Sequence, residues 1–91
     1  MYAYEQITVD GTVYWLQVFC QRNTSHVIQL NIERDGSTCG WWTKDSRGRV
    51  RSNVAAAVPS RLADGCKLWM ATDGYQDISP KEFLTSLGVL R

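Results

Sequence analysis

Residues 12–20 read TVYWLQVFC, and this run has the β-branched and aromatic composition of a β-strand. Successive side chains of a strand point to opposite faces of the sheet. Apolar side chains occupy both faces here: Tyr14, Leu16 and Val18 on one, and Val13, Trp15 and Phe19 on the other. A strand that is apolar on both faces is typical of the interior of a sheet. We therefore expect residues 12–20 to form a central strand.

Strand-like segments lie on both sides of this run. Tyr2–Val9 precedes it, and Asp10-Gly11 between them suits a type I′ hairpin turn. His26–Glu33 alternates, with Ile28, Leu30 and Ile32 expected on the buried face. The remaining elements are a turn at Arg34–Ser37, a strand over Thr38–Lys44, a turn at Asp45–Gly48 and a short fifth strand at Arg49–Arg51. The pattern predicts an antiparallel meander of four or five strands, either open or curled towards a small barrel.

The second half of the chain has a different pattern. Ala55, Ala56 and Ala57 favour a short helix, which Pro59 interrupts. Gly65 is a candidate C′ residue, and Cys66–Ala71 then resembles a short strand. Ser79-Pro80-Lys81-Glu82 is a capping box with proline at the first helical position, and Gly88 suits the position after the helix end. This predicts a helix over Pro80–Leu87. The fold class is therefore α+β, in one domain over residues 1–91 that is β-rich over 1–51 and mixed over 52–91.

Charge is concentrated in one segment. The net formal charge of the 91-residue chain is +1, but residues 44–51 contain four basic residues and one acidic residue. The rest of the chain is therefore slightly acidic. Residues 1–5 lack a basic segment followed by an apolar run, and no apolar stretch is long enough to span a membrane. With three cysteines and no close pair among them, we expect reduced thiols, a cytoplasmic location and no membrane contact.

A search for reactive groups finds little. Cys20, His26, Cys39 and Cys66 are zinc-ligand types, but none of them forms the close pair that structural zinc sites use. His26 is the only histidine, so a thiol-dependent enzyme is the least favoured hypothesis. Asp73–Asp77 lacks the ligand series of an EF-hand loop, and there is no glycine-rich phosphate loop. We expect no catalytic residue, no metal and no cofactor.

The candidate binding segment is Trp41–Arg51. Its candidate site residues combine aromatic and basic side chains: Trp41, Trp42, Lys44, Arg47, Arg49 and Arg51. Adjacent tryptophans on a strand point to opposite faces, and two short helical segments can cover only one face of such a sheet. One tryptophan should therefore join the core, and the other should remain exposed, covered by a second layer or at an interface.

Three readings of this segment compete. A core tryptophan beside a solvated basic hairpin tip explains it without any function. Trp, Tyr and Arg are enriched at interface hot spots, which favours a non-enzymatic protein-binding module. Its partner would be another protein or a second copy in a homodimer, and its role that of an adaptor, a subunit or an inhibitor, including one encoded by a phage or mobile element. The alternative is a nucleic-acid-binding domain, in which the basic residues contact phosphates and a tryptophan stacks on bases.

Overall fold

The computed structural model describes residues 3–22, 24, 26–72 and 78–90. The strands are β1 (Ala3–Val9), β2 (Thr12–Cys20), β3 (Val27–Arg34), β4 (Ser37–Lys44) and β5 (Val50–Val54). Two helices follow, α1 (Ser60–Ala71) and α2 (Pro80–Ser86). The five strands form one antiparallel sheet in the order β1-β2-β3-β4-β5. The predicted α+β class and five-stranded meander are confirmed, and the sheet of the described residues is open, with β1 and β5 at its edges.

The hairpin turns follow from their residues. Asp10 and Gly11 have φ values of 52° and 79°, and Asp35 and Gly36 have φ values of 53° and 82°. Two consecutive residues of positive φ define a type I′ turn, whose twist matches that of the flanking strands. The predicted turns at these two positions are confirmed.

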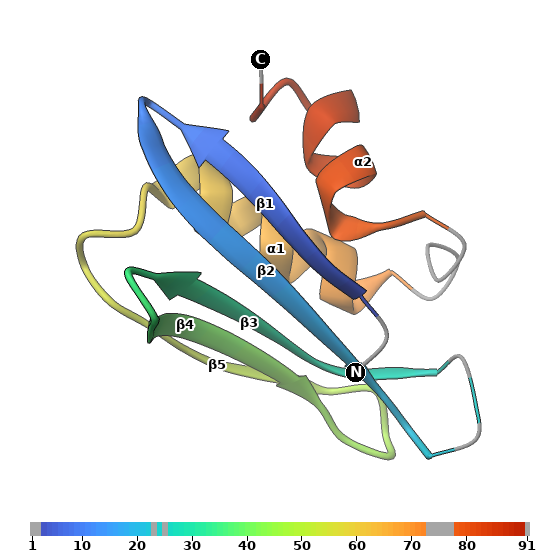
Figure 1. The fold of residues 1–91 in the computed structure, drawn as a ribbon. Helices are drawn as coiled ribbons and strands as arrows, with labels where there is room; N and C mark the ends of the chain where they lie inside the picture. Colours follow the sequence, from blue (N-terminus) through green and yellow to red (C-terminus); the bar gives the residue numbers. More distant parts are fainter. Residues whose placement is uncertain (1–2, 23, 25, 73–77, 91) are drawn as a thin grey trace.

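Both helices pack on the same face of the sheet (Figure 1). The core lies between the two helices and the sheet. Alternate residues of β1 to β4 form its sheet side: Ile7, Val9, Tyr14, Leu16, Val18, Leu30, Ile32 and Trp42. Its helix side is formed by Leu62, Cys66, Trp69, Met70, Phe83 and Leu84. The other face of the sheet carries no helix of the described chain. We call these the covered face and the open face.

The strand pairing has two register shifts, one in the pairing of β2 with β3 and one in the pairing of β3 with β4, between Ile32 and Glu33. The first lies between Phe19 and Cys20 of β2 and leaves Ile28 of β3 as an unpaired extra residue. Ile28 was expected on the buried face with Leu30 and Ile32, but it is 38% exposed while the other two are fully buried. A bulge rotates the residues on one side of it relative to those on the other, so alternation counted through the bulge fails.

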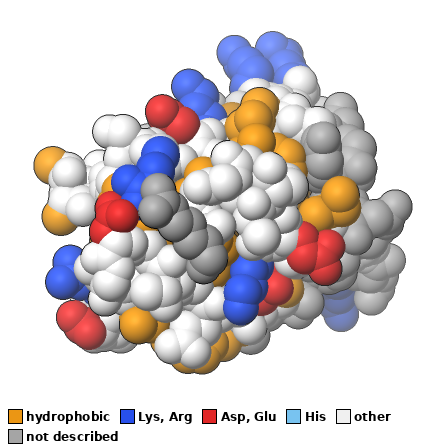
Figure 2. Space-filling model, turned by 90° about the horizontal axis from the view of Figure 1, so that it is seen from above, with side chains coloured by type: hydrophobic (Ala, Val, Ile, Leu, Met, Phe, Trp, Pro, Cys, Tyr) orange, Lys and Arg blue, Asp and Glu red, His pale blue; other side chains and the backbone are white. Residues whose placement is uncertain are grey.

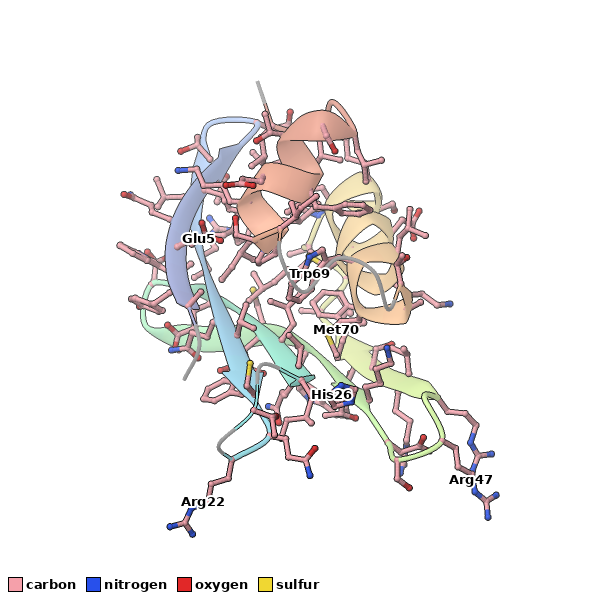
Figure 3. The ribbon with its side chains drawn as sticks, turned by 90° about the vertical axis from the view of Figure 1, so that its right-hand side faces the viewer. Glu5, Arg22, His26, Arg47, Trp69 and Met70 are labelled. Atoms are coloured by element: carbon pink, nitrogen blue, oxygen red, sulfur yellow. The ribbon has the colours of Figure 1, made fainter. Side chains whose placement is uncertain are left out.

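The structure of the segment that forms α1 differs from the prediction made from the sequence. Residues 66–71, expected as a short strand, form the second half of α1, and Ala55–Ala57 lie in the loop before it. Leu62, Cys66, Trp69 and Met70 recur at the spacing of one helical face, and all are buried. Figure 3 labels Trp69 and Met70.

The strand was expected because Gly65 resembles a residue that follows the end of a helix. Gly65 lies inside α1 and is not a C′ residue as predicted; a Cβ added to it would lie 2.5 Å from Leu84 Cδ2 of α2. The glycine therefore allows the two helices to approach closely. The indole Nε1 of Trp69 donates a hydrogen bond of 3.0 Å to the carbonyl oxygen of Ile78, which ties α1 to the segment before α2.

The caps of α2 agree with the prediction from the sequence. The Ser79 hydroxyl accepts a hydrogen bond of 3.2 Å from the Glu82 backbone N–H, and Pro80 is the first helical residue. At the other end, Gly88 has a φ of 78°, and the N–H of Val89 donates to the Leu84 carbonyl. The positive φ of Gly88 and the hydrogen bond from Val89 are features of a Schellman motif. The helix ends at Ser86, one residue before the predicted end.

Candidate functional site

The two adjacent tryptophans of β4 have opposite environments. Trp42 is opposite Leu30 in the register, on the covered face, and is 1% exposed. Trp41 is opposite Asn31, on the open face, and is partly exposed. The structure therefore places Trp42 in the core and leaves Trp41 as the tryptophan available at the surface, while the binding role expected of these residues stays a prediction.

The four basic residues of the predicted site do not all lie on one face of the sheet, although Arg49 and Arg51 line the same hollow. Lys44 pairs with Val50 on the covered face, whereas Arg51 pairs with Thr43 on the open face. Arg47 and Arg49 lie in the turn between β4 and β5. Strand alternation separates the first two, and the turn carries the others to one end of the sheet (Figure 3 labels Arg47).

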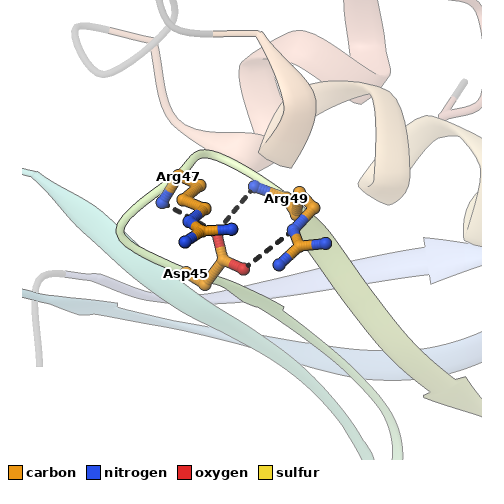
Figure 4. A network of polar contacts seen from close by, with 3 residues as sticks. All are labelled: Asp45, Arg47 and Arg49. Carbon is orange, nitrogen blue, oxygen red and sulfur yellow. Dashed lines mark hydrogen bonds and ion pairs between the residues drawn. The ribbon is translucent and has the colours of Figure 1, made fainter.

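The β4–β5 turn is organised by Asp45. Its Oδ1 accepts hydrogen bonds of 2.9 Å from the backbone N–H groups of both Arg47 and Arg49, and its Oδ2 lies 3.4 Å from Nε of Arg49 (Figure 4). The pKa of Asp45 is lowered, chiefly by the bond from the Arg49 N–H and further by the Arg47 N–H and the Arg49 guanidinium. Gly48, with a φ of 80°, completes the turn. Arg49 thus has a local structural partner, as expected of a solvated hairpin tip.

The open face gathers aromatic side chains from three strands. They are Tyr4 of β1, Trp15 and Phe19 of β2, and Trp41 of β4. Tyr4 and Trp15 stack with ring centroids 4.6 Å apart and an interplanar angle of 12°. The Tyr4 hydroxyl donates a hydrogen bond of 3.1 Å to Oε1 of Glu33, and desolvation, followed by this carboxylate, raises the pKa of Tyr4.

Amide side chains separate these aromatic groups. A single row crosses all five strands on the open face: Tyr4, Gln17, Asn31, Trp41 and Asn53. Nε2 of Gln29 donates to Oδ1 of Asn31 at 2.8 Å, and Nδ2 of Asn31 approaches Oε1 of Gln17 at 3.5 Å. Mutual hydrogen bonds limit the rotamers of these amides, so the surface between the aromatic rings is partly preorganised.

Charged groups are sparse on the open face. Among its described strand residues, Glu33 and Arg51 are the charged side chains, and their formal charges cancel. A shallow hollow beside Trp41 is lined by Thr38, Cys39, Gly40, Asn53 and Ala55. The face therefore offers apolar area, amide donors and acceptors and little net charge.

The environments of the three thiols do not favour the thiolate form. Burial raises the pKa of the Cys20, Cys39 and Cys66 thiols, which lowers their thiolate fraction. His26 is exposed just before β3. Within the described ranges, no three His, Cys, Asp or Glu residues lie together as they would to hold a metal ion. The Asp73–Asp77 segment considered for calcium lies outside the described residues.

Comparisons with protein-family models, with curated proteins and with solved structures found no match for this chain. Neither helix of the described chain has the length and apolar character needed to cross a bilayer.

Sequence reasoning assigned the candidate site to one continuous segment, but the open face is assembled from several strands. Trp15 and Phe19 were recognised as sharing one face of their strand, and this was the available signal. The pairing of β2 with β1 and β3, and of β3 with β4, then brings Tyr4 and Trp41 onto the same surface. A single segment cannot show such a surface, because its members are joined only through strand register.

Proposed function

We propose that this chain is a small non-enzymatic protein-binding module that uses the open face of its sheet. The observation that supports this most directly is that Tyr4, Trp15, Phe19 and Trp41 all lie on the open face, which carries no helix of the described residues. A sheet face without cover that presents several aromatic side chains is a frequent site of protein association. The roles consistent with such a module are those of an adaptor, a subunit or an inhibitor in the cytoplasm.

The physical case rests on what a partner would gain from this surface. Aromatic side chains bury a large area with few rotatable bonds, which is why they dominate interface hot spots. The amides around Asn31 can satisfy the backbone groups of a partner. Interface cores are depleted of charged residues, and the open face has the same character, with Glu33 and Arg51 as its charged strand residues within the described chain.

Nucleic-acid binding is the second candidate. Exposed aromatic residues on a sheet can stack on bases, and Trp41 with Arg51 on the same face favours this reading. Contacts to phosphates, however, need several basic side chains along the path of the nucleic-acid backbone. Arg47 and Arg49 lie at the hairpin tip and not along the open face. Figure 2 looks onto another end of the molecule, and basic and acidic side chains are interspersed there too. Protein binding is therefore the better-supported function.

The test is affinity capture from the native host with three matched baits: the wild type, Trp41→Ala and Leu68→Ala. Leu68 is a suitable control because it is 49% exposed on α1, on the other side of the sheet. We expect a protein partner that is recovered with the wild type and with Leu68→Ala but lost with Trp41→Ala. Purified partner and bait should then reproduce this difference by calorimetry.

Two outcomes would contradict the proposal. Recovery that nuclease abolishes, with affinity that falls steeply as salt increases, would support nucleic-acid binding instead. A partner that binds the Trp41→Ala bait as well as the wild type would place the interaction away from the open face.

A further inference from the structure

We propose that β5 is a homodimerisation edge, at which the β5 strands of two copies pair antiparallel about a two-fold axis through Ser52. The two five-stranded sheets would then form one continuous sheet. This inference concerns the edge of the sheet and does not depend on the use of its open face.

The hydrogen-bond phase of β5 shows which groups are available at its edge. The Ala55 N–H donates to the Cys39 carbonyl at 2.8 Å, and the Asp45 N–H donates to the Arg49 carbonyl at 3.0 Å. In an antiparallel pair, residues alternate between those bonded to the partner strand and those directed away from it. Counting from either of these bonds gives the same result: Val50, Ser52 and Val54 direct their N–H and C=O groups away from β4.

The sequence of β5 allows the outward-directed residues of one copy to pair with those of a second copy. It reads Val-Arg-Ser-Asn-Val over Val50–Val54, so an axis at Ser52 places Val50 opposite Val54 of the second copy and Ser52 opposite its own copy. All three outward-directed residues then bond to outward-directed residues of the partner strand. A shift of the axis to Arg51 or Asn53 leaves fewer of these groups paired.

Charge favours the same register. With the axis at Ser52, Arg51 of each copy is opposite Asn53 of the other on the open face, where the guanidinium can donate to the amide oxygen. With the axis at Arg51, the two arginines would be directly opposite each other, and like charges at opposed positions are destabilising.

The other edge of the sheet is protected, which limits assembly to two copies. Glu5 of β1 is on the covered side, and its carboxylate Oε1 lies 3.4 Å from the Lys81 backbone N–H at the start of α2, which packs against β1 (Figure 3). A charged residue directed inward and an adjacent helix are known protections of edge strands. Strand β5 has no proline and no acidic residue, and its Ser52 is exposed even on the covered side. One open edge and one protected edge give a closed dimer, not a fibre.

Matched proline substitutions test the edge. Ser52→Pro removes an N–H that points away from β4, so the β4–β5 ladder is retained. Gln6→Pro is the control on β1: its N–H also points outward, because the two-residue turn makes Val9–Thr12 a bonded pair and the pairs alternate from there. Circular dichroism should show that both variants are folded. By sedimentation velocity over a range of concentrations, we expect Ser52→Pro to raise the dimer dissociation constant about 100-fold and Gln6→Pro to leave it unchanged.

A charge exchange tests the register. Asn53→Arg places two arginines opposite each other at both symmetry-related positions, so we expect the dissociation constant to rise about tenfold. The double variant Arg51→Glu/Asn53→Arg places opposite charges at these positions and should restore dimerisation to the wild-type level or better.

Three results would overturn the proposal. The first is a wild-type chain that stays monomeric at every concentration. The second is a dimer that Ser52→Pro does not weaken, which would use another surface. The third is a dimer that Asn53→Arg weakens but the double variant does not restore, which would exclude the register centred on Ser52.

Discussion

The two faces of the sheet differ in what covers them, and the adjacent tryptophans of β4 show the consequence. Trp42 on the covered face is buried in the core where α1 packs on β4, whereas Trp41 on the open face is partly exposed among amides and other aromatic rings. The covered face is mostly aliphatic where the strands pair, and the open face mixes Trp, Tyr and Phe with Gln and Asn. Two residues of identical chemistry therefore have different environments, according to which side the helices occupy, and only Trp41 is available for the recognition role that we propose.

The largest effect expected from this comparison is on stability. Trp42→Ala removes a fully buried indole and leaves a cavity, so the free energy of unfolding should fall by about 3–5 kcal/mol. Urea denaturation followed by far-ultraviolet circular dichroism measures this change. A loss as small as that of a surface substitution would contradict the assignment of Trp42 to the core.

The contact between the two helices that form the cover gives the next largest effect. Gly65→Ala should destabilise the protein by about 1–3 kcal/mol, because the new methyl group meets Leu84 in a filled core. The same substitution made in a Leu84→Ala background should cost clearly less, and thermal unfolding of the four proteins in this cycle measures the difference. Equal costs in the two backgrounds would show that this contact does not limit the approach of α1 to α2.

Trp41→Ala should separate binding from folding. We expect a stability loss of about 1 kcal/mol, because only part of the side chain is removed from solvent. For the partner identified by capture, the loss of affinity should be about tenfold or more, as at interface hot spots. Denaturation and calorimetry on the same preparation provide both values. A large stability loss without any change in affinity would reverse the roles assigned to the two tryptophans.

The smallest effect concerns the β4–β5 turn, which lies at one end of the sheet and belongs to neither face. Because the pKa of Asp45 is lowered in the folded state, its contribution to stability is present above the unfolded pKa and is lost as the pH falls through the folded pKa. Asp45→Asn removes the titrating charge, so this variant should lose less stability than the wild type between neutral and acidic pH. Thermal unfolding over that range tests this, and parallel pH profiles for the two proteins would argue against it.

Local patterns in the sequence determined much of this molecule. The Asp-Gly pairs of positive φ define two hairpins, Ser79 and Gly88 delimit α2, and alternation in β2 predicts its two apolar faces. These features depend on the conformational preferences of neighbouring residues, so they can be recognised without knowledge of the rest of the chain.

The tertiary structure decided the features that depend on distant segments. The position of the helices determines that Trp42 is buried and Trp41 is open, and the bulge in β3 moves Ile28 to the surface. Gly65 resembles a helix end when only its neighbours are considered, yet α1 continues through it, and Leu84 of α2 lies where a side chain at this position would be. Burial and helix contact are relations between segments far apart in the chain, so only the packed structure determines which face, edge and glycine serve each purpose.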